Sequence, residues 1–159
     1  MHLTDLLTSN RVAIRRDEGN GHSFSKSDAL SLLASLLATG SGQVQRANVE
    51  RVLVEREQLQ STGIGDGVAI PHGALSELDA QVASLLIAPD GVDFAAIDGH
   101  KVTILFAVVG PKRATGEHLK TLARVSRLLR NKGFREQLVA APNADAAYDL
   151  IAKEEADQK

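Results

Sequence analysis

The sequence of 159 residues predicts an α/β (α+β) fold in which helices sandwich a mixed sheet of roughly five strands. Two observations lead to this prediction. Continuous apolar runs cluster in the middle of the chain, and uninterrupted runs are typical of strands that are buried on both faces. Segments with helical spacing lie before and after these runs, so helices can cover both faces of the sheet.

The strand candidates are the short apolar runs at 11–14, 68–70, 82–88 and 102–109. The helix candidates are the segments at 26–38, 43–59, 115–131, 134–140 and 142–151. Two connections carry turn signals. The glycine-rich segment 61–67 is predicted to be irregular, and 89–91, with the sequence Pro-Asp-Gly, is predicted to be a turn between strands.

Several helix boundaries are marked in the sequence. Ser25 and Asp28 have the spacing of a capping box, in which each side chain bonds the other residue's backbone N–H. Thr115 is the predicted N-cap of the first helix in the last third of the chain, and Lys132-Gly133 is predicted to end that helix. The polar tail, about 153–159, is expected to fray, and residues 1–159 are interpreted as a single domain.

Composition excludes several classes of function. The chain has no cysteine, so disulfides, thiolate nucleophiles and thiolate metal sites are ruled out. A formal charge of −2 and an aromatic content of 3% argue against a nucleic-acid-binding protein. No apolar run is long enough to span a membrane, and the N-terminus lacks the pattern of a signal peptide, so we expect a cytoplasmic protein.

His72 is the first candidate for chemistry. It stands between Pro71 and Gly73, after a buried-strand candidate and beside the glycine-rich segment. Pro71 fixes its own φ, and Gly73 is expected to let the chain turn sharply and leave the imidazole uncrowded. A histidine on a rigid turn can accept a phosphoryl group on one ring nitrogen while the other nitrogen holds an orienting hydrogen bond. A purely structural turn histidine is the alternative, and this pattern alone leaves both open.

Arg56 and His118 are the other two candidates. On a helical wheel Arg56 falls within an apolar stripe, where an arginine needs an anionic partner, either a phosphoryl group or a buried carboxylate. With Thr115 as N-cap, His118 is the third helical residue and borders a buried stripe, where a neutral imidazole could donate to phosphate or simply decorate the first turn. The remaining histidines are interpreted as surface residues, namely His2, His22 and His100.

Metal and nucleotide sites are not predicted. His72 and His118 lie 46 positions apart with no carboxylate at a known ligand spacing. The glycine-rich segment has the spacing of neither of the common nucleotide-binding glycine loops. We therefore expect no cofactor.

One long stretch resembles the signature of the mannitol/fructose/nitrogen-regulatory class of phosphotransferase-system enzyme IIA domains, the type-2 IIA domains. The stretch is Arg56-Glu57-x-x-x-Ser61-Thr62-Gly63-Ile64-Gly65-x-Gly67-Val68-Ala69-Ile70-Pro71-His72-Gly73. Its wording is most similar to the nitrogen-regulatory branch. Two interpretations of Asp66 stay open, a turn cap or a charge that repels phosphate and tunes transfer.

The resemblance implies a role for each residue. His72 would accept a phosphoryl group from a phosphohistidine carrier (HPr/NPr-like) and become a tele-phosphohistidine, with Arg56 and His118 completing the catalytic group. Residues Ser61, Thr62, Gly63 and Gly73 would form the phosphate-binding loop. The further partners would be regulatory target proteins or a separate IIB domain, and the oligomeric state stays open.

Three functions follow as hypotheses. The first is a regulatory phosphorelay protein of the nitrogen/potassium type. The second is a sugar-specific component that passes phosphate to a separate IIB domain. The third is a binding module that no longer transfers phosphate.

Overall fold

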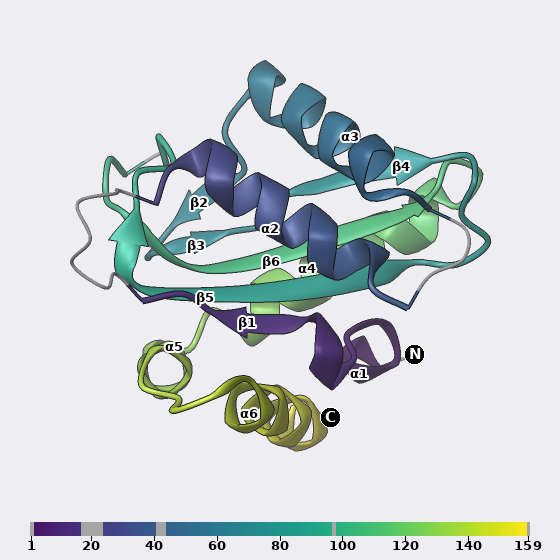
Figure 1. The fold of residues 1–159 in the computed structure, drawn as a ribbon. Helices are drawn as coiled ribbons and strands as arrows, with labels where there is room; N and C mark the ends of the chain where they lie inside the picture. The colour runs from purple at the N-terminus through teal and green to yellow at the C-terminus, as the bar shows by residue number, and fades with distance from the viewer. Residues whose placement is uncertain (1, 17–23, 41–43, 97, 159) are drawn as a thin grey trace.

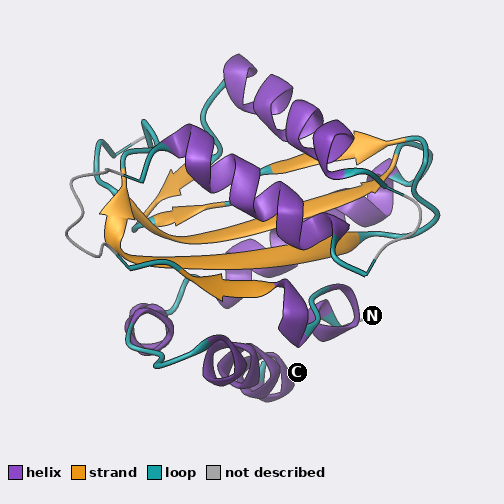
Figure 2. Ribbon diagram, viewed as in Figure 1, coloured by secondary structure: helices purple, strands orange, loops and turns teal. Residues whose placement is uncertain are grey.

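The computed structural model describes residues 2–16, 24–40, 44–96 and 98–158. A six-stranded mixed sheet lies between two helix layers, which confirms the predicted fold class with one strand more than expected (Figures 1 and 2). The strands are β1 (Val12–Ile14), β2 (Gly63–Gly65), β3 (Val68–Ala69), β4 (His72–Leu75), β5 (Val82–Val92) and β6 (Val102–Pro111). The helices are α1 (Leu3–Leu6), the 3-10 turn η1 (Ser9–Arg11), α2 (Lys26–Ala38), α3 (Arg46–Leu59), α4 (Thr115–Leu128), α5 (Lys132–Val139) and α6 (Ala144–Asp157).

The strand order is β1-β5-β6-β3-β2, and β4 also pairs with β6. β5 and β6 form the antiparallel centre, whereas β1 runs parallel to β5. β3 and β4 both run parallel to β6 and follow one another along the same edge of it. Val68 pairs with Ile104 and His72 pairs with Val108, so the register is unchanged across the gap between β3 and β4. His72 is therefore the first residue after an interruption in an otherwise continuous line of pairing.

The central strand β6 is buried on both faces, which explains its continuous apolar sequence. Ile104, Phe106 and Val108 pack in one core with α1, α4, α5 and α6. The residues between them pack in a second core with α2 and α3, and they are Leu105, Ala107 and Val109. Figure 1 shows these two helix layers on opposite sides of the sheet. Successive side chains of a strand point to opposite faces, so each core takes every second residue.

In the α2–α3 layer, α2 forms as the sequence predicts, whereas α3 buries a different face from the predicted one. The capping box of α2 is present, with Asp28 N–H donating to Ser25 Oγ at 3.0 Å. In α3 the buried residues are Val49, Leu53 and Glu57, spaced four apart. The buried stripe is thus rotated away from Arg56, which the sequence placed within it and which is only half-buried.

The boundaries of the last three helices differ from the prediction. Ala114, not Thr115, is the N-cap of α4, which ends at Leu128. Lys132 and Gly133 begin α5 instead of ending α4, because Asn131 Oδ1 accepts from Phe134 N–H and caps the new helix. α6 continues to Asp157, beyond the predicted end at Ile151, so most of the tail expected to fray is helical.

Two segments predicted as loops are strands. Gly63–Gly65 forms β2 and pairs with β3 through a two-residue turn in which Asp66 and Gly67 both have positive φ. An Asp-Gly pair with this conformation is typical of a tight hairpin. The segment 89–91 lies within β5, where the register shifts between Ile87 and Val92 and Gly91 has a φ of 84°. A bulge therefore absorbs the turn signal without ending the strand.

No described helix combines the length and the apolar character that a membrane crossing requires.

Candidate functional site

His72 is the first residue of β4, and one of its ring nitrogens is hydrogen-bonded to the backbone. Its Nδ1 lies 2.7 Å from the carbonyl oxygen of Ile70. A carbonyl can only accept, so Nδ1 carries the proton and neutral His72 keeps a lone pair on Nε2. The side chain is half-buried, and burial lowers the pKa of His72; the hydrogen bond to Ile70 opposes this lowering, and the positive charge of Arg56 adds to it. The net lowering of the pKa favours the neutral ring.

The neighbours of His72 hold the strand rather than turn it. The Pro71 carbonyl accepts from Val108 N–H at 3.0 Å. Gly73 lies in regular pairing opposite Val109 and has no positive φ, so the predicted sharp turn there is wrong. A Cβ at Gly73 would lie 2.2 Å from Val52 Cγ1 of α3. Glycine is needed at this position because helix α3 packs directly against the backbone of β4.

The ring of His118 lies beside the ring of His72. This residue lies in the first turn of α4, where its N–H donates to Ala114 O at 3.1 Å, one position later in the helix than predicted. The two imidazole rings have centroids 5.8 Å apart and planes tilted by 52°. Burial lowers the pKa of His118, and the charge of His72 lowers it further. Two histidines this close disfavour each other's protonation.

Arg56 lies at the edge of the α3 stripe, half-buried, and its Nη1 donates to the carbonyl of Gln60 at 2.9 Å. In the described part of the chain no carboxylate forms an ion pair with it. The alternative of a buried Arg–carboxylate pair therefore has no support among these residues. The guanidinium is close enough to His72 to influence its pKa.

These side chains share one cavity of about 280 Å³. It is lined by Arg56, Gln60, Ser61, Thr62, Ile64, Ile70, His72, Leu122 and Ser126. Four of the predicted site residues thus line a common cavity, and His118 lies against it through its contact with His72. The surface assignment of His2 and His100 fits, since both are exposed, whereas His22 lies outside the described residues.

The predicted phosphate-binding loop is held by internal bonds. Thr62 is buried, and its N–H and Oγ1 donate to Glu57 at 2.9 and 2.5 Å. Gly63 N–H donates to Ser61 Oγ at 3.1 Å, and Ser61 Oγ donates to Phe94 O at 2.9 Å. Gly63 and Gly73 do not line the cavity. The Thr62 and Gly63 amides are therefore already occupied in this structure.

Comparison with known proteins identifies the family. The model of the phosphoenolpyruvate-dependent sugar phosphotransferase system EIIA 2 family matches residues 16–154. The chain belongs to this EIIA 2 family. The EIIA 2 protein is 41% identical, over 128 residues, to the nitrogen regulatory protein of Bradyrhizobium diazoefficiens, covering 80% of this chain and 83% of that one.

Two further relatives of this EIIA 2 chain differ in kind. The fructose-specific EIIABC component of Bacillus subtilis is 30% identical over 95% of this chain, which matches 23% of that longer protein. The crystal structure of the nitrogen regulatory protein IIA-Ntr from Neisseria meningitidis superposes with a TM-score of 0.82 at 30% identity. That alignment covers 94% of this chain and 98% of the other. The fold and the nitrogen-regulatory resemblance are both confirmed.

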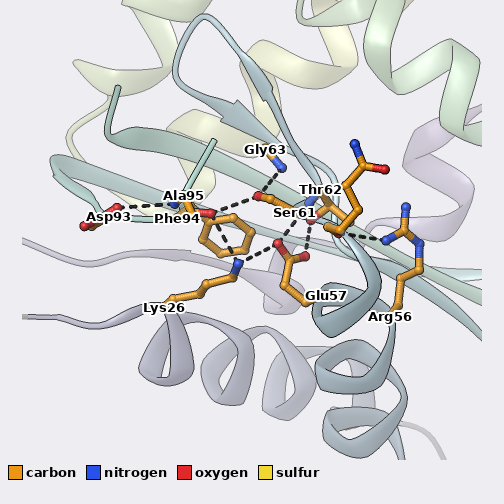
Figure 3. A network of polar contacts seen from close by, with 10 residues as sticks. Lys26, Arg56, Glu57, Ser61, Thr62, Gly63, Asp93, Phe94 and Ala95 are labelled. Carbon is orange, nitrogen blue, oxygen red and sulfur yellow. Dashed lines mark hydrogen bonds and ion pairs between the residues drawn. The ribbon is translucent and has the colours of Figure 1, made fainter. Parts of the chain in front are cut away.

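Glu57 of this EIIA 2 chain was assigned no role from the sequence, yet it bonds Thr62 of the cavity lining. It is 7% exposed and pairs with Lys26 Nζ at 2.8 Å (Figure 3). Its place four residues after Leu53 and eight after Val49 was the signal that could have found it. Asp66, by contrast, is exposed at the β2–β3 turn and does not line the His72 cavity, which favours the turn interpretation.

Proposed function

We propose that this EIIA 2 protein is a phosphoryl carrier that accepts a phosphoryl group on Nε2 of His72 from a phosphohistidine carrier protein (HPr/NPr-like). We further propose that it acts mainly as a regulatory switch. The observation that carries the proposal is the bond from His72 Nδ1 to Ile70 O. It fixes the tautomer in which Nε2 is the free nucleophile.

The transfer step needs positioning more than covalent catalysis. The Nε2 lone pair of neutral His72 attacks phosphorus in line with the P–N bond of the donor histidine. That bond breaks, and its electron pair returns to the donor imidazole. The proton on Nδ1 of His72 stays in place, and Ile70 O stabilises the positive charge that the ring gains on forming the new bond.

Arg56 and His118 would stabilise the arriving phosphoryl group. The guanidinium bonds only the Gln60 carbonyl among the described groups, so it can turn its remaining N–H donors toward phosphate. His118 stands 5.8 Å from His72, centroid to centroid, and its neutral ring can accept or give a proton as the charge at the site changes. The bound dianion would raise the affinity of His118 for a proton.

The surroundings of the cavity suit a protein partner. Ile64, which lines the cavity, is 47% exposed, and Leu119, next to His118, is 61% exposed. An exposed apolar side chain in a cavity lining, as Ile64 is, favours contact with an apolar surface on a partner. We propose that the carrier protein docks here and brings its phosphohistidine to His72.

The regulatory role is proposed from the relatives. The nitrogen regulatory protein of Bradyrhizobium diazoefficiens and IIA-Ntr of Neisseria meningitidis align with this chain along most of their own length. Phosphorylation would add about −1.5 to −2 charges in the cavity that exposed Ile64 lines. Such a change reverses a docking preference when the target is apolar or acidic at that point.

Phosphoryl uptake from a phosphorylated carrier tests the proposal, with wild type, His72→Ala, His118→Ala and the matched control His100→Ala. The exposed His100 lies outside the cavity, so its variant should label like wild type. His72→Ala should take up no phosphate, and His118→Ala should label more slowly. No label on folded wild type with an active donor would refute the carrier function and favour a binding module that does not transfer.

The fructose-specific relative supports a second candidate, a sugar-transport component that hands phosphate to a separate IIB domain. Incubating the phosphorylated protein with a free fructose-type IIB domain separates the two functions. Rapid loss of label from His72 to that domain would favour the sugar role. Retained label, with target binding that depends on phosphorylation, would favour the regulatory role.

A further inference from the structure

Glu57 is a buried carboxylate with a complete set of partners. Its Oε1 lies 2.8 Å from Lys26 Nζ and accepts from Thr62 N–H at 2.9 Å, while Oε2 accepts from Thr62 Oγ1 at 2.5 Å. Lys26 is itself held, because its Nζ donates to Phe94 O at 3.2 Å and lies 4.5 Å from the Phe94 ring centroid. Figure 3 shows Glu57 pointing from α3 toward both Lys26 and Thr62.

A continuous line of hydrogen bonds leads from this carboxylate to the reactive ring. Thr62 N–H donates to Glu57, Thr62 O accepts from Ile70 N–H at 3.0 Å, and Ile70 O accepts from His72 Nδ1 at 2.7 Å. The N–H and the carbonyl of Thr62 belong to different peptide groups joined through Cα, and the same holds for Ile70, so the line passes on position and not polarisation. The bond from Glu57 holds the Thr62 backbone, and the Thr62 carbonyl holds the Ile70 backbone, whose own carbonyl bonds His72.

We propose that Glu57 is a positioning residue for His72, acting through the backbone of Thr62 and Ile70 to hold the Nδ1–H tautomer that leaves Nε2 free. The proposal rests on the proposed phosphoryl transfer for its kinetic consequence, but not for its effect on the ring. A charged acceptor binds Thr62 N–H more strongly than a neutral one. Lys26 Nζ, 2.8 Å from Oε1, places a charge of opposite sign beside this buried carboxylate.

A merely structural role for Glu57 predicts something different. It would lower the stability of the α2–α3 layer on substitution, yet leave the tautomer of His72 unchanged in any variant that folds. The tautomer is measured from ring ¹⁵N chemical shifts in the unphosphorylated protein, so this readout does not depend on whether phosphoryl transfer occurs. The two roles are therefore separable even if the proposed function fails.

The decisive variant is Glu57→Gln, which keeps the shape of the side chain and removes its charge. Glu55→Gln is the matched control, since Glu55 lies on the same helix, is exposed, and pairs only with exposed Arg51 among the described residues. Glu57→Asp, which keeps the charge but withdraws the oxygens from Thr62, serves if Glu57→Gln does not fold.

We expect a raised population of the Nε2–H tautomer of His72 in Glu57→Gln, with the control Glu55→Gln like wild type. Phosphoryl uptake by Glu57→Gln should then slow by roughly ten- to a hundredfold, as for a misplaced reacting group. A wild-type tautomer in folded Glu57→Gln or Glu57→Asp would overturn the proposal. If wild type takes up no phosphate but the tautomer shifts in the variant, the positioning role stands and the proposed function fails.

Discussion

Replacing Gly73 with alanine would test how closely α3 packs against the reactive strand. The new methyl carbon would lie 2.2 Å from Val52 Cγ1 and 3.7 Å from the Val52 carbonyl oxygen. Carbon atoms in contact normally stay about 3.5–4.0 Å apart. Either Val52 or the whole of α3 must therefore move by more than an ångström, because β4 is held by its pairing with β6.

Overpacking of this kind costs about 1–3 kcal/mol in free energy of unfolding. For a domain of this size, each 1 kcal/mol corresponds to a drop of about 2–4 °C in Tm. Gly73→Ala should therefore lower Tm by roughly 2–12 °C. The same movement would displace the strand that carries His72, so phosphoryl uptake should slow as well.

Thermal unfolding followed by circular dichroism measures the loss. Gly116→Ala is the matched control, because a Cβ there meets nothing within 4 Å, and its Tm should equal or exceed that of wild type. The double variant Val52→Ala/Gly73→Ala should be less destabilised than the two single losses predict, since the shortened side chain vacates the contested space. Additive losses in the double variant, or a wild-type Tm for Gly73→Ala, would refute the packing explanation.

Three further predictions concern pH, capping and a second glycine. Burial lowers the pKa of His72 and His118, so the folded state binds fewer protons than the unfolded chain. The free energy of unfolding should fall as pH drops below about 6.5, less steeply in His118→Ala, and a flat urea-denaturation profile would contradict this. Asn143→Ala removes the N-cap of α6 and should cost about 1 kcal/mol in urea, against no loss if the cap is idle. Gly63→Ala would set a methyl 2.7 Å from Ala96 Cβ and 2.9 Å from its Cα, so its Tm should drop; an unchanged Tm would show that the 93–96 segment yields freely.

The parts of the fold predictable from sequence were those with local or periodic signals. The central strands were found because burial on both faces leaves an unbroken apolar run, as in 102–109. The start of α2 was found because Ser25 and Asp28 are three residues apart and cap each other. At the site, the predicted candidates Arg56 and His72 line one cavity, and His118 adjoins it.

What escaped prediction depends on contacts between distant segments. The role of Gly73 is set by Val52, which belongs to another element, so no pattern around residue 73 reveals it. The burial of Glu57 depends on how α3 is rotated on the sheet, and a carboxylate in an imperfect apolar stripe gave no reason to rotate it that way. The continuation of β5 through 89–91 was not predicted, because Pro, Asp and Gly suit a turn between strands as well as a bulge within one strand.

The alternation of β4 has a consequence for how this site can change over evolution. His72 pairs with Val108, which faces the α4 layer, and Gly73 pairs with Val109, which faces α3. Inserting or deleting one residue between Ile70 and His72 would exchange these directions, sending the imidazole into the α3 layer and away from His118. A change of two residues would keep the direction. The imidazole keeps its direction only when the number of inserted or deleted residues is even. Insertions and deletions of an odd number of residues, which most loops tolerate, would therefore abolish reactivity here.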